Sequence, residues 1–422
     1  MTEVIVTPQI GEERDKSSIK RLSFLGVSGS SLVALLVCWV FVIFDGYDLI
    51  VYGTVQTSLA REWNLTNTTL GTIGSTAFLG MALGAIFIGR ISDLVGRKKA
   101  VLLSVVILSV FTVCCAFAPN PWFFGGLRFV AGLGLGGLVP SVNALTAEVA
   151  PRRTMSAWAT LMMSGVPLGG SLAALLGTGV VPSHPEWGWR IMFLVAVIPL
   201  AVGIPLAMKY LPKDLKPDAN KKAAVPESSG FKDLLGSKYR TISLWFALAT
   251  FVTLFAWYGL GTWLPRLMET AGYDLGAALL FTLALNIGAI IGSGLTAWAG
   301  DRFGPLQAGI IAAFIAGVAL CSLLVMPPVW AVYLILICAG VGTHGSQILI
   351  IAAIANGYPG SLRGTALGWA LGTGRIGAVV APQLAGLFLG WGFGVNSNFI
   401  LFGFSALLSS FLMFLVLRKQ LK

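Results

Sequence analysis

The stretch GRISDLVGRKK, residues 89–99, recurs in altered form as AWAGDRFGP at residues 297–305. Asp93 and Asp301 are 208 residues apart, and a glycine follows each of them three residues later. Each copy comes at the end of a long apolar run. We therefore predict that both copies are short polar loops that follow helices in corresponding positions.

Two aromatic pairs have nearly the same offset. Trp158 and Trp369 are 211 residues apart, and so are Tyr47 and Tyr258. Three matches at nearly one separation indicate an internal duplication. Such repeats are typical of transporters built from two bundles, whose binding site lies between the halves.

Long apolar runs fill most of the chain. Hydrophobic residues make up 56% of the 422 residues and charged residues only 11%, with a mean hydropathy of +0.85. Soluble domains are about one quarter charged, and a membrane span needs about 20 mostly apolar residues. We predict an all-α polytopic membrane protein with twelve transmembrane helices, arranged in two six-helix bundles related by the repeat. The predicted spans lie near 31–55, 70–90, 100–118, 121–143, 156–181, 189–210, 241–268, 276–299, 306–326, 329–355, 364–390 and 397–417.

One long polar segment separates the sixth span from the seventh. It is rich in lysine, proline and serine, a composition typical of linkers. The predicted parts of the chain are a cytoplasmic N-terminal segment 1–30, an N-terminal bundle 31–210, a cytoplasmic linker 211–240, a C-terminal bundle 241–417 and a cytoplasmic C-terminus 418–422.

The basic residues predict how the chain is oriented in the membrane. Of the 28 Lys and Arg residues, Arg61, Arg190 and Arg266 fall on one side, and Arg128 and Arg375 fall inside spans. The remaining 23 lie in the termini, the linker and the loops of the other side. Because basic residues favour the cytoplasmic side, we predict a cell-membrane protein with both termini cytoplasmic. The net charge of +11 is then a topology signal and not a nucleic-acid surface.

Several classes of protein and site find no support in the sequence. All five cysteines lie inside apolar runs, which indicates small buried residues and neither a disulfide framework nor a metal site. The chain has no GxxxxGK[ST] phosphate loop, no HExxH motif and only two histidines. We therefore predict neither an enzyme nor a primary pump, and no metal or other cofactor.

The loop at residues 89–99 resembles the loop motif of the major facilitator superfamily. The residues in register with that motif are Gly89, Asp93, Gly96, Arg97 and Lys98. Three further stretches look like the aromatic acid:proton symporter family, namely DGYD at 45–48, GTHGSQ at 342–347 and GWALGTGRIGAVVAP at 368–382. The resemblance implies uptake of a small, benzoate-like carboxylate with a proton. We also predict that the protein functions as a monomer in the lipid bilayer.

Four charged residues fall inside the predicted spans. Asp45 and Asp48 are three residues apart on one helical face, where two carboxylates in a low dielectric cannot both ionise easily. We predict that this pair couples transport to a proton, and the alternative is a structural ion pair with Arg128. Arg128 is either that partner or an anion site. Arg375 has no acidic residue in its own helix, so its planar fork is predicted to bind the substrate carboxylate or to form a pair between helices.

The formal charges of these four residues favour symport of an anion with a proton. They sum to zero when both aspartates are ionised. Protonating one aspartate leaves one positive charge, which a monoanionic substrate cancels. Neutral occupancy is the least costly state for a moving site buried in hydrocarbon.

Uncharged candidates for the substrate site come from four other positions. His344 is the only histidine inside a span, and is either a buried structural residue or a ligand for substrate or proton. Tyr47, Tyr258 and Trp369 could stack on a substrate ring, although most membrane aromatics serve packing or the interface.

A second group of candidates lies at the predicted cytoplasmic rim. Glu148 precedes a loop that contains Arg152, so it has arginine neighbours. The superfamily resemblance implies a latch that closes the inner face, and ordinary capping of helix ends is the alternative. The predicted gate residues are Gly89, Asp93, Gly96, Arg97, Glu148, Arg152 and Asp301.

Two kinds of transport remain open on this predicted fold. The favoured one is import of an aromatic carboxylate with a proton, by alternating access of the two halves. The alternative is a proton-coupled antiporter for drugs or other organic ions. Uptake of labelled benzoate that rises with external acid would support the first, and efflux of cations would support the second.

Overall fold

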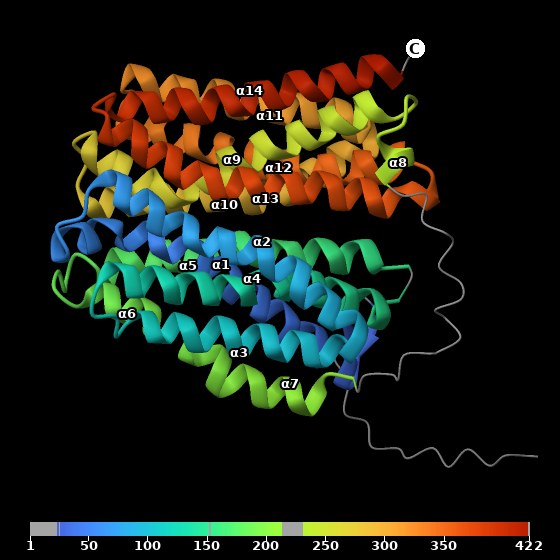
Figure 1. Cartoon of the computed structure of the whole chain (residues 1–422), viewed down its shortest axis with the longest axis horizontal. Coiled ribbons are helices and arrows are strands. Elements are labelled where there is room, and N and C mark those ends of the chain that lie inside the picture. The colour runs from blue at the N-terminus through green and yellow to red at the C-terminus, as the bar shows by residue number, and fades with distance from the viewer. Residues whose placement is uncertain (1–22, 25, 152, 213–230, 421–422) are drawn as a thin grey trace, which may run out of the picture.

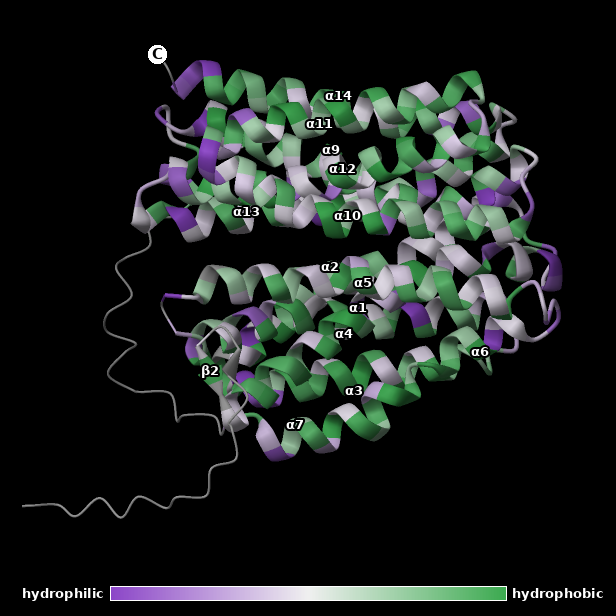
Figure 2. Cartoon of the chain, turned by 180° about the vertical axis from the view of Figure 1, so that it is seen from behind, coloured by the Kyte–Doolittle hydropathy of each residue, from purple (hydrophilic) through white to green (hydrophobic). Residues whose placement is uncertain are grey.

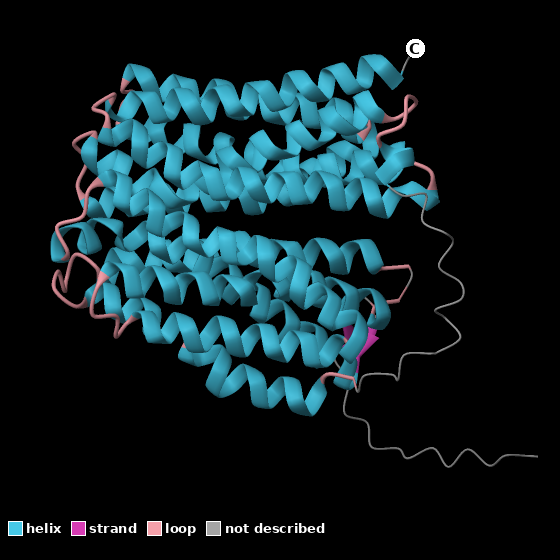
Figure 3. Ribbon diagram, in the orientation of Figure 1, coloured by secondary structure: helices cyan, strands magenta, loops and turns pink. Residues whose placement is uncertain are grey.

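A computed structural model describes the chain over residues 23–24, 26–151, 153–212 and 231–420. Helix accounts for almost all of this (Figure 3), apart from a short antiparallel pair of strands, β1 (Ser23–Phe24) and β2 (Val27–Ser28). The helices of the first half are α1 (Gly29–Glu62), α2 (Asn67–Val95), α3 (Arg97–Cys115), α4 (Pro121–Val149), α5 (Met155–Val180), α6 (Gly188–Leu194), the π-helical turn η1 (Pro199–Gly203) and α7 (Ile204–Tyr210). Those of the second half are α8 (Phe231–Leu234), α9 (Arg240–Thr270), α10 (Leu275–Phe303), α11 (Pro305–Ser322), the short 3₁₀ helix η3 (Leu323–Val325), α12 (Val329–Gly357), α13 (Gly360–Gly390) and α14 (Gly394–Gln420).

The helices form two bundles that lie side by side (Figure 1). Helices α1–α7 make up one bundle and α9–α14 the other. Hydrophilic residues gather at the two ends of the molecule, and the lengths between are mostly hydrophobic (Figure 2). Counting α6, η1 and α7 as one span, the described residues contain the twelve spans in two bundles that the sequence predicted.

Eleven of these spans are long and apolar enough to cross a membrane by length and composition alone. Helix α13 is not among them, although its 31 residues are sufficient in length. Arg375 and Gln383 lower the hydropathy of α13, and the helix packs between α9 of its own bundle and α2 of the other. Partial burial between helices therefore accounts for a span that is less apolar than its neighbours.

The sixth span is less regular than its sequence predicted. A continuous helix was expected near 189–210, but the π-helical turn η1 begins at Pro199 and separates α6 from α7. Proline has no backbone N–H and clashes with the carbonyl one turn earlier, so it interrupts the regular hydrogen-bond ladder. The other spans are mostly longer than predicted at their ends, since the helices continue beyond their apolar cores.

Close contact between α1 and α5 depends on two glycines. A Cβ at Gly46 would lie 1.9 Å from the Val166 carbonyl oxygen, and a Cβ at Gly169 would lie 1.8 Å from that of Ile43. No side chain fits at these distances, so the backbones of the two helices touch. In membranes, such small-residue contacts drive helix association because lipid removes most of the hydrophobic effect. The contact holds the middle of α1 rigidly in place, next to Asp45.

The two copies of the loop motif have the same local geometry. Gly96 ends α2 with φ 112° and begins α3, and Gly304 ends α10 with φ 91° and begins α11. Positive φ values of this kind favour glycine. The matching geometry supports the internal duplication that the sequence indicated.

Candidate functional site

Asp48 and Arg128 form a buried ion pair within the N-terminal bundle. Arg128 Nη1 donates to Asp48 Oδ2 at 2.6 Å, and Nη2 donates to the Asp48 main-chain oxygen at 3.1 Å. The Thr112 hydroxyl donates to the other carboxylate oxygen at 2.6 Å. Both charged side chains are only 3% exposed. These contacts join α1, α3 and α4, and they support the structural ion pair that the sequence left open for Asp48.

Asp45 is buried in a different environment, one helical turn earlier in α1. Its Oδ1 atom has no hydrogen-bond partner among the described residues, although the residue is only 3% exposed. Its charged neighbours are Arg375, which attracts it, and Asp48, which repels it. An ionised carboxylate without compensation is costly in such a place. Asp45 therefore differs from Asp48 in having no hydrogen bond or ion pair to its carboxylate among the described residues.

Arg375 lies on α13, at the boundary between the two bundles. Its Nη1 atom lies 2.9 Å from the Met81 sulfur in α2 and 3.4 Å from the Tyr258 hydroxyl oxygen in α9. No carboxylate in the described part of the chain forms an ion pair with it. Gly374 and Gly377 flank it and face α9, where added Cβ atoms would collide with Leu254 and with the Phe251 backbone. Close packing of α13 on α9 thus fixes the position of a guanidinium that has no carboxylate in an ion pair with it among the described residues.

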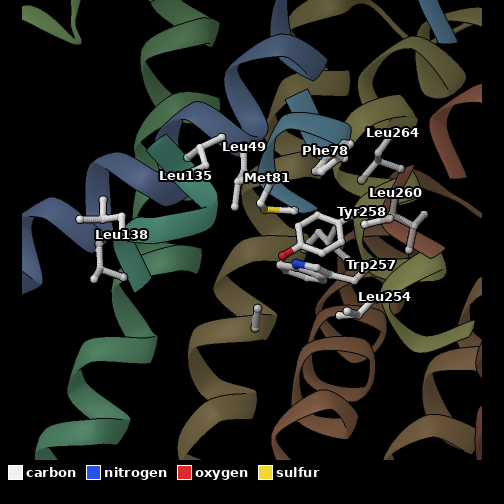
Figure 4. Close-up of a cluster of buried hydrophobic side chains, with 14 of the residues drawn as sticks. Leu49, Phe78, Met81, Leu135, Leu138, Leu254, Trp257, Tyr258, Leu260 and Leu264 are labelled. Atoms are coloured by element: carbon white, nitrogen blue, oxygen red, sulfur yellow. The ribbon is translucent and has the colours of Figure 1, made fainter. Parts of the chain in front are cut away.

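Aromatic side chains surround this charged centre. Figure 4 shows Phe78 and Met81 from α2 beside Trp257 and Tyr258 from α9. The Phe78 and Tyr258 ring centroids are 4.9 Å apart. The next residue along, Trp257, lies 5.1 Å from the His344 ring. Two adjacent aromatic residues of α9 therefore link Arg375 with His344: Tyr258 contacts Arg375, and Trp257 contacts His344.

His344 borders a cavity between the bundles. The cavity has a volume of about 230 Å³, and helices α4, α5, α10 and α12 contribute its walls. The His344 ring is buried, and neither of its nitrogens has a hydrogen-bond partner among the residues described. Asn143 and Gln347 add amide groups to the lining.

Two predicted aromatic ligands lie away from this centre. The Tyr47 hydroxyl donates to the Met192 main-chain oxygen at 2.8 Å, so its ring points into the N-terminal bundle toward α6. Trp369 donates from its indole to the Ser243 main-chain oxygen at 3.2 Å, near the start of α9. The structure thus brings Asp45, Arg375 and Tyr258 together and leaves Tyr47 and Trp369 in packing positions.

The predicted gate residues are only partly described. Arg97 Nε donates to Glu148 Oε1 at 3.5 Å, and its Nη1 donates to the Ser92 hydroxyl at 2.9 Å. Gly89 has open space around it, Asp301 is exposed at the end of α10, and Gly96 forms the turn between α2 and α3. Arg152 and the side chain of Asp93 lie outside the described residues.

A cluster that the sequence analysis missed joins the bundles at the end opposite to α8. The Thr57 hydroxyl and Arg61 of α1 both contact the Glu269 carboxylate of α9, the arginine at 3.0 Å. Arg266 Nη1 donates to the Thr57 oxygen at 3.3 Å. We call Thr57, Arg61, Arg266 and Glu269 the outer cluster. Its signal in the sequence was the presence of opposite charges at the ends of the first and seventh spans, which are repeat equivalents.

A metal site finds no support in the part of the chain that the structure describes. Three or more His, Cys, Asp or Glu residues do not come together there in a metal-binding arrangement. Four ion pairs of the described residues each join two helices, namely Arg61–Glu269, Arg97–Glu148, Arg128–Asp48 and Arg190–Glu62.

A fold of two helical bundles with charged residues at the boundary between its halves is typical of membrane transporters. A model of the Major Facilitator Superfamily matches residues 36–382 and also residues 277–422, so the chain belongs to this superfamily. The match confirms the superfamily that the loop motif at 89–99 indicated. It also places the chain among multi-pass membrane transporters and not among enzymes.

The chain also resembles individual curated transport proteins. The chain is 71% identical over 403 residues to a gentisate transporter of Corynebacterium glutamicum, covering 95% of this chain and 91% of that protein. It is 35% identical over 413 residues to a benzoate transport protein of Acinetobacter baylyi, covering 89% and 87% of the two chains. A solved D-xylose-proton symporter has the same fold, with a TM-score of 0.77, 17% identity, and coverage of 91% of this chain and 97% of that one.

Proposed function

We propose that the protein takes up a small aromatic monocarboxylate, gentisate or a closely related ring acid, together with a proton. The observation that carries this proposal is the placement of Asp45 and Arg375 on facing bundles. The first has a buried carboxylate oxygen without a hydrogen-bond partner, and the second has no ion-pair partner, among the described residues. The gentisate transporter and the benzoate transport protein support the choice of substrate class, because the chain resembles both along most of its length.

The charges of the site balance in both the empty and the loaded state. Asp48 and Arg128 neutralise each other within the N-terminal bundle. In the empty state of this proposal, Asp45 is ionised and balances Arg375, its attractive neighbour across the boundary. When Asp45 takes up a proton, Arg375 is free to bind the substrate carboxylate, and the site is again neutral. Neutrality in both states lowers the cost of moving the site through a low dielectric.

The contacts of Arg375 suit a planar anion. A guanidinium offers two parallel N–H donors to a carboxylate. Its present contacts are a thioether and a phenol, which are weaker acceptors than a carboxylate, and a substrate would replace them. Tyr258 and Phe78 provide aromatic surfaces beside the guanidinium for the substrate ring.

Alternating access in this proposal moves the bundle of residues 31–210 against that of residues 241–417. The segment 211–240 and both termini are placed in the cytoplasm on the basis of the basic residues. The outer cluster then closes the external side, and the His344 cavity lies on the path to the cytoplasm. One chain holds both halves of the site, so a monomer is sufficient.

Uptake into proteoliposomes tests the proposal. Purified protein should accumulate labelled gentisate or benzoate when the outside is acidic, and a protonophore should abolish the accumulation. If the acid only equilibrates across the membrane and is not accumulated, the claim that transport is coupled to a proton is wrong. If no ring carboxylate enters, or if organic cations leave in exchange for protons, the proposed function is wrong.

A further inference from the structure

The cavity beside His344 has hydrogen-bonding groups that the charged centre does not use. Its volume is about 230 Å³. Sites for drug-sized ligands measure about 300–1,000 Å³, so this cavity suits a single small ring. Asn143, His344 and Gln347 give the lining polar groups, and Met163 and Ile348 give it apolar surface. A ring with polar substituents matches this combination.

His344 is the group in the cavity with the greatest need of a partner. It is only 2% exposed, and both of its ring nitrogens lack a hydrogen-bond partner among the described residues. Buried polar groups without partners are rare because each one loses its hydration. A neutral imidazole has one donor and one acceptor, and a phenolic hydroxyl can serve either of them.

Asn143 faces the same cavity from the other bundle. It lies on α4, whereas His344 lies on α12. Its amide nitrogen contacts the Met163 sulfur at 3.9 Å, and a thioether is a weak acceptor. A phenolic oxygen would be a better partner for this amide. The two bundles therefore present hydrogen-bonding groups from opposite walls.

Trp257 connects the cavity with the carboxylate end of the proposed site. Its ring lies 5.1 Å from that of His344, and the hydroxyl of the adjacent Tyr258 lies 3.4 Å from Arg375 Nη1. An aromatic acid is charged at one end and flat in the middle. Its carboxylate can therefore face Arg375 while its ring lies along Trp257 and its ring substituents face His344.

We infer that His344 and Asn143 form a subsite for the ring hydroxyl groups of an aromatic carboxylate. The subsite determines the preference for hydroxylated rings over unsubstituted benzoate. This inference rests on the proposed function, since the cavity must receive an aromatic acid. A site built to hydrogen-bond a hydroxyl discriminates against the analogue without it, because the polar groups of the protein are then left unpaired.

The test compares gentisate, which has two ring hydroxyls, with benzoate, which has none. Affinities are measured by uptake and by competition in proteoliposomes. Wild-type protein should prefer gentisate. His344→Leu should weaken gentisate about tenfold and change benzoate by less than about twofold, since only the hydroxyl contact is removed. His344→Gln keeps a donor and an acceptor, so it should retain most of the preference.

Asn143→Leu tests the subsite independently, because Asn143 lines the opposite wall of the cavity. If His344→Leu does not fold, this variant still tests the inference. It should also reduce the preference for gentisate. Ser346→Ala is the matched control, because the Ser346 hydroxyl donates to the Gly342 main-chain oxygen in the same helix and does not line the cavity. This control should keep the wild-type ratio of affinities.

The outcomes separate this inference from the proposed function. If the wild type transports neither acid, the proposed function fails. If it transports both without preference, or if His344→Leu and Asn143→Leu leave the ratio unchanged, only the subsite is wrong. Equal losses for both acids in folded His344→Leu would also overturn the inference, because they would assign His344 to the transport cycle itself.

Discussion

Arg128 holds Asp48 by an ion pair of 2.6 Å and by a second hydrogen bond to the backbone of the same residue. Asp45 is one turn away on the same helix and has no such partner in the described part of the chain. Two aspartates that look equivalent in the sequence thus have different environments. Asp48 is fixed within its bundle, whereas the electrostatic partner of Asp45, Arg375, lies in the other bundle. This difference gives the two residues separate expected roles.

Asp45→Asn should abolish accumulation driven by a proton gradient, because an amide cannot take up and release the proton. The variant should still fold, since Asp45 makes no ion pair within the described residues. It should also retain exchange of labelled for unlabelled acid, which needs no net proton movement. Proteoliposome uptake with and without a gradient measures the first effect, and counterflow measures the second. Accumulation at the wild-type level would remove Asp45 from the coupling step.

Asp48→Asn should instead destabilise the N-terminal bundle. Removing one partner of a buried ion pair costs about 3–5 kcal/mol, because the other charge is left uncompensated. Thermal unfolding in detergent should show a clear loss of stability for Asp48→Asn and little loss for Asp45→Asn. The double variant Asp48→Asn/Arg128→Gln should recover part of the loss. Equal stability of the two single variants would contradict the separate roles.

The sequence predicted the spans well because hydropathy depends on composition over about 20 residues. It did not predict the break at Pro199, since a π-helical turn depends on local hydrogen bonds that hydropathy does not register. It also assigned Asp45 and Asp48 one shared role. Their spacing puts them on one helical face. The residue that gives them different environments is Arg128, which binds Asp48 and lies 80 positions from it in the chain.

The aromatic candidates show a second limit of sequence reasoning. Tyr47 and Tyr258 are equivalent by the repeat, yet Tyr47 packs against α6 and Tyr258 faces Arg375. Which way a side chain faces depends on how its helix is rotated in the bundle, and the weak amphipathicity of membrane helices leaves that rotation undetermined. His344 was identified because a histidine inside a span is rare, but its cavity depends on four helices from both halves.

Glu269→Gln should favour opening of the external side. In the ion pair of Glu269 with Arg61, the arginine side chain is 67% exposed and the glutamate side chain 19% exposed. Exposed ion pairs contribute about 0.2–1 kcal/mol, so losing the contact to the exposed Arg61 should raise the outward-open population by about 1.4- to fivefold. Spin labels at Ser183 and Thr270, at the same end of the two bundles, can report this by electron–electron distance measurements.

Glu62→Gln is the matched control for this prediction. Glu62 pairs with Arg190 at 2.7 Å within the N-terminal bundle, so its loss breaks no link between the bundles. The distance distribution should then stay as in the wild type. An equal shift in both variants would mean that general surface charge, and not the outer cluster, affects opening.

Single cysteines at Ser183 and Lys238 should label from opposite sides of the membrane. Both positions are exposed, the first between α5 and α6 and the second between α8 and α9. In a background without the five native cysteines, an impermeant thiol reagent added to intact cells should react at position 183 and not at 238. Permeabilised cells provide the control, since both sites should then react. The reverse pattern would overturn the orientation inferred from the basic residues.

Arg375→Lys should weaken binding of the aromatic acid, and Arg375→Ala should leave little binding. Lysine keeps the charge but lacks the planar fork that a bidentate contact with a carboxylate requires. A charge-assisted hydrogen bond contributes about 1.5–3 kcal/mol, so its loss corresponds to a drop in affinity of about ten- to hundredfold. Calorimetry on purified protein measures the affinity, and circular dichroism checks that each variant is folded.

Binding of the primary amide of the same acid tests whether Arg375 recognises the charge of the carboxylate or only packs against the ring. It has the ring but no carboxylate, so it should bind the wild type poorly and lose little further in Arg375→Ala. Tyr258→Phe is a useful companion variant, because it removes the hydroxyl 3.4 Å from Arg375 and keeps the ring that packs on Phe78. It should therefore cost less affinity than Arg375→Lys. If Arg375→Ala binds the acid as the wild type does, the guanidinium has a structural role between α2 and α13. The anion site would then have to be sought at His344, because the charge of Arg128 is already neutralised by Asp48.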